Sequence, residues 1–103
     1  MSEYEAGDIN VVADDETNES NVDRAVYSAS VLKYLATSMA DEPEVVSVDI
    51  DDTPRGIKLS LHVGPTDMGR VIGRRGRTAQ AIRTIVGAAG ARDGVVTNVD
   101  IVD

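Results

Sequence analysis

The first strong pattern along the chain is a recurrence of apolar residues at helical spacing. Ser20 or Asn21 can cap the start of a helix, and Asp23 suits its first turn, near the positive end of the helix dipole. Pro43 cannot continue a helix. We therefore expect a helix over about residues 21–40. Its apolar face, at intervals of three or four, consists of Val22, Val26, Ala29, Leu32, Leu35, Ala36 and Met39.

Two runs that alternate between apolar and polar residues follow this helix. One covers residues 44–51 and the other residues 57–63. Alternation with a single apolar face is typical of half-buried strands. The sequence TPRG at residues 53–56 lies between them and is a turn signal. The two runs therefore predict a β-hairpin.

The last 40 residues predict two helices and a strand. Gly64 and Pro65 end the hairpin, and Thr66 or Asp67 can cap a short helix over residues 68–72. The sequence GRRG at residues 73–76 interrupts it, and a second helix starts at Arg77 and ends before Gly94. A strand over residues 95–102 completes the order helix, strand, strand, helix, helix, strand. The predicted apolar face of the second helix contains Ala81, Ile82, Ile85 and Ala89.

Length and composition limit the classes of protein that this chain can represent. A chain of 103 residues predicts one domain. It contains no Cys, which excludes a disulfide scaffold, a thiolate metal site and a cysteine nucleophile. Its acidic N-terminus has no apolar signal-peptide region, and no apolar run approaches the roughly 20 residues that span a bilayer. We therefore expect no membrane partner, and the absence of Cys fits a reducing compartment.

The charge of the chain is divided unevenly along its length. The net charge of −8 lies entirely in residues 1–23, which contain no Lys or Arg, whereas residues 24–103 sum to zero. Few large apolar residues accompany these acidic groups, so we expect residues 1–20 to form a disordered acidic tail and residues 21–103 to form the domain. Residues 67–86 carry a net charge of +4. The overall acidity therefore does not argue against a nucleic-acid partner.

The glycines and arginines at residues 73–76 form the motif with the clearest chemistry. Glycines three apart between two helices allow a tight turn. The backbone N–H groups of such a turn, together with the next helix N-terminus, can face an anion. Arg74 and Arg75 lie between these glycines, and arginine binds phosphate through two hydrogen bonds. The spacing matches neither a Walker A loop nor a Rossmann loop.

The helix–GxxG–helix sequence, preceded by Val71 and Ile72, resembles a KH domain. The element order resembles a type II KH domain: an α/β (α+β) fold, α-β-β-α-α-β, with three helices on one face of a three-stranded sheet. Residues 67–85 resemble most closely the small stand-alone bacterial KH proteins of the KhpA family. The resemblance covers about residues 21–103. The acidic extension departs from the short members of this family.

This resemblance implies that the chain binds about four nucleotides of single-stranded RNA. The GxxG loop would contact the sugar-phosphate backbone, while bases would lie over an aliphatic groove lined by residues such as Ile72 and Ile82. The chain contains no Phe or Trp from which an aromatic stacking platform could be built. Arg70, Arg77 and Arg83 would be auxiliary phosphate contacts. The implied RNA-binding residues are Arg70, Ile72, Gly73, Arg74, Arg75, Gly76, Arg77 and Arg83.

The resemblance also implies a non-catalytic, cytoplasmic protein, an RNA chaperone or post-transcriptional regulator. It would form a homodimer or pair with a larger Jag-type KH protein (KhpB). The competing hypothesis is a dimerisation or docking module with weak RNA binding of its own. We expect no catalytic residues, cofactor or small-molecule substrate, because the single His and the carboxylates form no acid–base or nucleophile constellation.

Several residues have an ordinary structural interpretation beside the functional one. Arg74 and Arg75 could be solvated loop residues, and His62 falls on the polar face of a strand. The carboxylates at residues 49–52 are of the chemical type that binds hard cations such as calcium. No glycine-rich calcium loop surrounds them, however, so we do not expect a metal site there. Tyr27 and Tyr34 share a helix face that suits either the edge of the core or a dimer. Finally, we expect the acidic tail to compete with RNA for the loop arginines.

Overall fold

The computed structural model describes residues 20–102, so the prediction of a disordered tail over residues 1–20 lies almost wholly outside the described residues. The expected N-terminal helix is split into α1 (Asn21–Arg24) and α2 (Val26–Met39). Ser20 caps α1, because its hydroxyl accepts a hydrogen bond from the Asp23 N–H at 3.1 Å. The split occurs at Ala25, which is fully buried. Val26, expected in the core, is exposed instead.

The hairpin is formed by β1 (Ser47–Thr53) and β2 (Gly56–His62). The first strand starts later than predicted because Pro43–Val45 forms a 3-10 turn. The turn at residues 53–56 is confirmed: the Thr53 hydroxyl donates to the Gly56 carbonyl at 2.7 Å. Gly56 has a φ of 118°, and a Cβ there would lie 2.7 Å from the Val96 carbonyl oxygen, so only glycine fits.

The C-terminal half contains α3 (Met68–Ile72), α4 (Arg77–Arg92) and β3 (Thr97–Val102). The 3-10 turns Pro65–Asp67 and Arg74–Gly76 precede α3 and α4. The expected short helix is therefore confirmed with its predicted bounds, and α4 starts at Arg77 as predicted. The last strand begins two residues later than the apolar run suggested.

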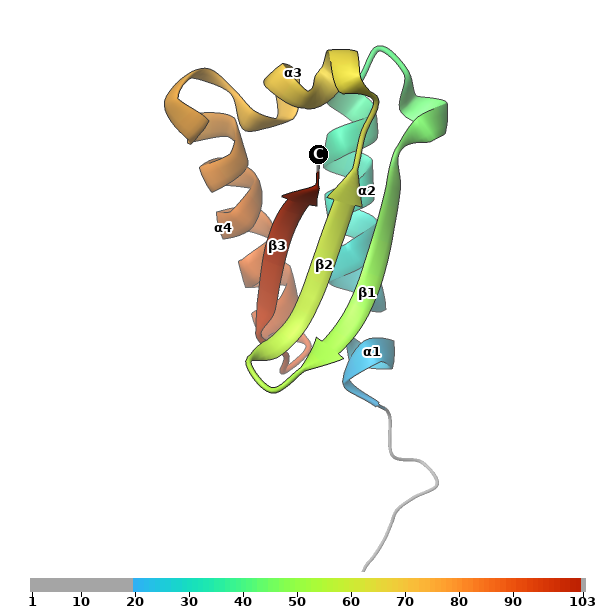
Figure 1. Cartoon of the computed structure of the whole chain (residues 1–103). Helices are drawn as coiled ribbons and strands as arrows, with labels where there is room; N and C mark the ends of the chain where they lie inside the picture. The colour runs from blue at the N-terminus through green and yellow to red at the C-terminus, as the bar shows by residue number, and fades with distance from the viewer. Residues whose placement is uncertain (1–19, 103) are drawn as a thin grey trace, which may run out of the picture.

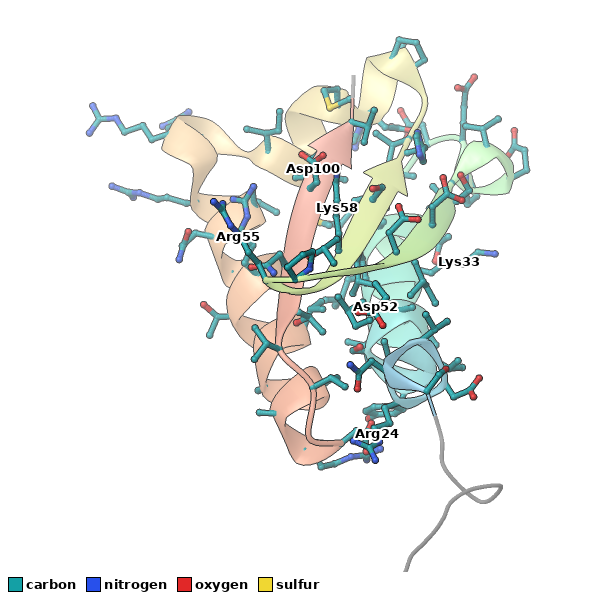
Figure 2. The ribbon with its side chains drawn as sticks, turned by 60° about the horizontal axis from the view of Figure 1, so that its bottom comes forward. Arg24, Lys33, Asp52, Arg55, Lys58 and Asp100 are labelled. Atoms are coloured by element: carbon teal, nitrogen blue, oxygen red, sulfur yellow. The ribbon has the colours of Figure 1, made fainter. Side chains whose placement is uncertain are left out.

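A three-stranded mixed sheet with helices on one face organises the molecule, as the α+β prediction required (Figure 1). The strand order is β1-β2-β3; β1 and β2 are antiparallel, and β2 and β3 are parallel. α2 and α4 lie behind the sheet, and α3 crosses the end of the helical layer (Figure 1). The other face of the sheet is polar, and Lys58 and Asp100 lie together on it, 3.7 Å apart (Figure 2).

The core lies between this sheet and the helical layer. Its largest fully buried apolar side chains come from both layers: Leu32, Ile57, Leu59, Leu61, Val71 and Val86. Burying such a side chain contributes about 1.5–3 kcal/mol. Val71, which is fully buried, and the partly buried Met68 attach the short α3 to this core.

The buried face of α4 differs from the predicted one. The structure buries Ala79, Ile82, Val86 and Gly90, whereas Ala81 and Ile85 are exposed. The predicted face shares only Ile82 with the observed one, and it left out Val86. The observed face includes Gly90, where a Cβ would lie 2.7 Å from Thr97 Cγ2 of β3. Small residues allow the helix backbone to approach the strand, and hydrophobic spacing alone does not report such an approach.

Within the described residues, no helix is both long and apolar enough to cross a membrane. The boundaries of a domain over residues 21–103 remain a prediction.

Candidate nucleic-acid interface

The loop between α3 and α4 has a backbone that depends on its two glycines. Gly73 has φ 77° and ψ 173°, a conformation essentially restricted to glycine. Its N–H donates to the Gly69 carbonyl at 2.8 Å and ends α3, while the Gly76 N–H donates to the Gly73 carbonyl at 3.1 Å. Gly76 is in the left-handed region, with φ 74° and ψ 13°. The chain therefore reverses between the two helices in a defined tight turn.

The two glycines differ in the space around them. A Cβ on Gly73 would lie 2.6 Å from Thr78 Cβ and 2.9 Å from the Thr78 nitrogen, on the first turn of α4. A Cβ on Gly76 would meet nothing within 4 Å. Gly73 is thus required by both conformation and space, and Gly76 by conformation alone.

Arg75 has an unusual backbone for a residue with a side chain. Its φ of 58° and ψ of 26° place it in the left-handed region. That region costs an L-residue other than glycine about 1–2 kcal/mol. Residues held in such conformations cluster at binding sites, where they present a side chain in a fixed direction. Arg75 is exposed at the tip of the turn.

Arg74, Arg75 and Arg77, which we call the loop arginines, concentrate positive charge at this turn. All three are exposed, and no carboxylate of residues 20–102 lies within the 4.0 Å of an ion pair with them. α4 starts at Arg77, so the positive end of its dipole adds to the same potential. The arrangement suits an anion with several oxygens.

Arg70 lies close to the loop, but acidic side chains already hold its guanidinium. Its Nη2 is 2.9 Å from Asp41 Oδ2, and its Nε is 3.4 Å from Asp67 Oδ1. Two carboxylates therefore compensate its charge. The structure separates Arg70 from the loop arginines, which lack such partners in the described part of the chain.

Asp67 anchors α3 to the segment that follows α2. Its side chain is fully buried and accepts hydrogen bonds from the Asp41 N–H at 2.9 Å and the Glu42 N–H at 3.0 Å. These two bonds, with the nearby Arg70 guanidinium, lower the pKa of Asp67, against the opposing effect of burial. The sequence offered Asp67 only as a helix cap. Nothing in the sequence indicated its partners, which lie about 25 positions earlier.

Arg83 faces the outer edge of the sheet. It lies six residues after the start of α4, less than two turns along the helix, and its Nε donates to the Val99 carbonyl oxygen of β3 at 3.4 Å. β3 pairs with β2 on one side, and no other described strand pairs with its second edge. Arg83 is thus exposed beside a strand edge, on the same helix as Arg77.

The apolar residues expected at the site are only partly available. Ile72, which ends α3 beside Gly73, is 37% exposed. Ile82 is only 3% exposed and belongs to the core, so the expectation that it lines a groove is wrong. The neighbouring Ile85 is 48% exposed and was assigned to the core by its spacing. The site therefore has less aliphatic surface than the sequence predicted.

Away from this loop, the described structure has a hollow but no metal-binding cluster. No group of three His, Asp or Glu side chains within residues 20–102 could hold a metal ion. His62 pairs with Asp49 at 3.1 Å on the polar sheet face. A hollow of about 380 Å³ lies between the hairpin turn and the turn after α4, lined in part by Arg55, Gly94 and Val96. It lies at the other end of the molecule from α3 (Figures 1 and 2).

Comparison with known proteins identifies relatives of the folded part. A family model described as the KH domain of KhpA/KhpB matches residues 29–101. A protein named RNA-binding protein KhpA from Leifsonia xyli subsp. xyli is 45% identical over 75 residues, covering 73% of this chain and 96% of its own length. The protein of that name from Streptomyces coelicolor is 49% identical over 72 residues, covering 70% of this chain and 87% of its own length. The one from Mycobacterium bovis is 44% identical over 72 residues, covering 70% and 86%.

Proposed function

This chain belongs to the KhpA/KhpB KH-domain family, and from that premise we propose that it binds single-stranded RNA through the turn between α3 and α4. The observation that carries the proposal is the set of loop arginines. They are exposed, without a described carboxylate partner, and held on a backbone that only glycines at positions 73 and 76 allow without strain. The name of these relatives, RNA-binding protein KhpA, supports the same ligand.

We expect the loop to contact phosphates rather than bases. Arg74 and Arg75 would bind the sugar-phosphate backbone together with the backbone of Gly73 and Gly76, and Arg77 would add charge from the start of α4. Arg83 would extend the contact along α4. Arg70 would contribute less, because Asp41 and Asp67 already compensate its charge. Such contacts carry little sequence information.

Ile72 is the aliphatic residue best placed to meet a base, because it is partly exposed and adjoins Gly73. The chain has no Phe or Trp to stack on bases. We therefore expect modest affinity and weak sequence preference for a short single-stranded segment. We propose a non-catalytic role in the cytoplasm, as an RNA chaperone or post-transcriptional regulator.

A titration of the full chain with a fluorescein-labelled octauridine, followed by anisotropy at increasing KCl, tests the proposal. Contacts from about three arginines predict that log K falls with log[KCl] with a slope of about −2. A blunt-ended RNA duplex is the control and should bind more weakly, because its bases are paired. Absence of octauridine binding at the lowest salt concentration would contradict the proposal.

A second candidate function is a dimerisation or docking module with weak RNA binding. Tyr27 and Tyr34 of α2 are 45% and 70% exposed, and Ile85 is exposed on α4, which packs beside α2. The partner would be a second copy or a larger Jag-type KH protein (KhpB). Light scattering of the isolated chain, together with the octauridine titration, separates the two functions. A tight dimer without RNA affinity would favour the docking module.

A further inference from the structure

The two long helices expose large apolar side chains on the side away from the sheet. Of the seven large hydrophobic side chains that are exposed among the described residues, four lie on α2 and α4: Val26, Tyr27, Tyr34 and Ile85. Tyr34 is the most exposed of them, at 70%. Both helices pack on the sheet through their buried residues, so the core does not account for these side chains.

One contact fixes how α2 and α4 lie beside each other. Arg92, the last residue of α4, lies over the ring of Tyr27, the second residue of α2, at 3.8 Å from its centroid. The start of α2 therefore adjoins the end of α4, and the two helices run in opposite directions (Figure 1). Seven residues along each helix from this contact, about 10.5 Å away, are Tyr34 on α2 and Ile85 on α4. These two side chains thus lie at the same level on adjacent helices.

Neither α2 nor α4 contains an acidic residue. The acidic residues of the described chain lie instead in α1, in the strands and in the connecting segments. Even the first turns of α2 and α4 have none, although the positive end of a helix dipole favours Asp or Glu there. The charged residues of the two helices are all basic: Lys33, Arg77, Arg83 and Arg92. Arg83 is directed to β3, and Lys33 lies on the side of α2 away from α4 (Figure 2).

The exposed side of α4 begins at the proposed RNA-binding turn. Arg77 is both a loop arginine and the first residue of α4. Thr84 and Ala88, which are exposed, lie within about 20° of Arg77 around the helix axis. Ile85, with Tyr34 at the same level, is about 12 Å along the helix from Arg77. We call the following side chains the outer helical face: Tyr27, Tyr34, Arg77, Ile85, Ala88 and Arg92.

The chemistry of the outer helical face fits a single-stranded nucleic acid. Bases stack on aromatic rings and on guanidinium planes, and the face offers the exposed ring of Tyr34 and the guanidinium of Arg92. Asp93 lies 3.3 Å from Arg92 Nε, so Arg92 offers a stacking plane more than a free charge. A second copy of the chain fits less well, because a symmetric contact would bring basic groups together with no acidic residue on either helix.

We propose that the outer helical face is a second RNA-binding surface, on which nucleotides beyond those at the GxxG turn lie with a base stacked on Tyr34. The inference rests on the proposed function, because it extends an RNA strand that the turn already holds. The distance of about 12 Å from Arg77 to the level of Tyr34 equals three to four stacked nucleotides, each with a rise of about 3.4 Å. The turn itself accommodates about four nucleotides. A tetranucleotide therefore occupies the turn alone, whereas an octanucleotide reaches Tyr34.

Four variants separate stacking from charge on this face. Tyr34→Leu removes the ring but keeps an apolar side chain, and Tyr34→Phe, which retains a ring, is its matched control. Ala88→Glu introduces an acidic group, and Ala88→Gln is the control of equal size without the charge. Both positions are exposed, so we expect all four variants to fold, which circular dichroism verifies.

Titrations with octauridine and tetrauridine at 50 mM KCl test the second surface. For octauridine we expect Tyr34→Leu to lose at least about 5-fold in affinity and Ala88→Glu about 2- to 5-fold, whereas the Phe and Gln controls should change by less than about 2-fold. Tetrauridine affinity should change by less than about 2-fold in all four variants. Equal octauridine affinities of the native chain and Tyr34→Leu, or equal losses for both RNA lengths, would overturn the proposal.

NMR of the Tyr34 ring reports the contact directly. The chain has three Tyr and no Phe or Trp, so the aromatic spectrum is simple, and Tyr34→Leu identifies the Tyr34 signals. We expect octauridine to shift both these signals and the amides of residues 73–78, and tetrauridine to shift the amides alone. Amides that shift with octauridine while the Tyr34 ring does not would overturn this inference and leave the proposed function intact. A chain that binds neither RNA would overturn both.

Light scattering of the native chain and Tyr34→Leu, at the concentrations of the titrations, tests the protein alternative. We expect the two chains to have the same mass. A native dimer that Tyr34→Leu dissociates would assign the outer helical face to a second copy of the chain and overturn the proposal.

Discussion

Gly73 is the residue of the GxxG turn with the least tolerance for a side chain. Its ψ of 173° at positive φ is open almost only to glycine, and a Cβ would press against Thr78. We expect Gly73→Ala to destabilise the fold by the backbone strain of about 1–3 kcal/mol plus the collision. Gly76→Ala, which meets no neighbour, should cost about 1 kcal/mol.

Urea unfolding of the two variants checks this difference, with the native chain as the reference. Gly76→Ala serves as the matched control, since it adds the same methyl group three residues away. Equal losses of unfolding free energy would contradict the difference in space and backbone conformation between the two glycines.

Asp67 is a second residue whose surroundings predict a measurable effect, here on how stability depends on pH. Its pKa is lowered by the Asp41 and Glu42 N–H groups and by Arg70. A carboxylate with a lowered pKa stabilises the folded state above its unfolded pKa, near 4, and this contribution is lost as the pH falls through the lower folded value. Asp67→Asn should therefore be less stable than the native chain at pH 7.

The difference in stability between the native chain and Asp67→Asn should become smaller below pH 4, because the native Asp67 carboxylate becomes protonated. Thermal unfolding from pH 7 to pH 2.5 measures it. Asp100→Asn, on the open sheet face, provides the control, since its carboxylate is exposed and faces Lys58 at 3.7 Å. A difference between native and Asp67→Asn that stays constant over this pH range would argue against the anchoring role.

Among the secondary-structure elements, α4 is defined by how closely it approaches β3. Gly90 faces Thr97, where a Cβ would be 2.7 Å from Thr97 Cγ2, while Gly87 on the same helix meets nothing within 4 Å. Gly90→Ala should therefore destabilise the domain by about 1–3 kcal/mol through overpacking. Gly87→Ala should stabilise it by about 0.5–1 kcal/mol, because alanine loses less backbone entropy in a helix.

The two substitutions should change the free energy of unfolding in opposite directions, so each serves as the control for the other. Urea unfolding measures both, and circular dichroism verifies that helix content is retained. Stabilisation by Gly90→Ala would show that α4 lies farther from the sheet than the structure places it.

The elements also show what the sequence could predict. Alternation located the hairpin, and the glycines located α3 and the GxxG turn, because both signals are local. The break at Ala25 and the buried face of α4 were missed, because they depend on contacts between distant segments. Spacing placed both Ile82 and Ile85 on the buried face, but only Ile82 is buried; Ile85 is exposed, and the small Gly90 lies against the strand instead.

Across the molecule as a whole, charge and fold must be considered together. The sequence located the basic cluster at residues 67–86. It could not separate Arg70, which Asp41 and Asp67 compensate, from the loop arginines, which have no carboxylate partner among the described residues. That separation appears only once the chain is folded. The proposed interface is therefore smaller than the basic segment at residues 67–86: it consists of the GxxG turn and the start of α4.

A double variant of the GxxG turn tests whether this turn binds single-stranded RNA. Arg74→Asp with Arg75→Asp reverses the charge of the turn, and Asp tolerates the left-handed conformation at position 75 better than most residues do. Lys33→Glu with Arg55→Asp is the matched control, because it changes the net charge equally at exposed positions on α2 and in the hairpin turn (Figure 2).

Octauridine affinity at 50 mM KCl, measured by anisotropy on variants whose circular dichroism matches the native chain, is the deciding quantity. If the turn binds RNA, the double variant should lose at least about 30-fold in affinity, which is equivalent to the loss of two charge-assisted contacts. The affinity of the control should change by less than about 5-fold. Unchanged affinity in a folded Arg74→Asp, Arg75→Asp chain would contradict the assignment of the turn.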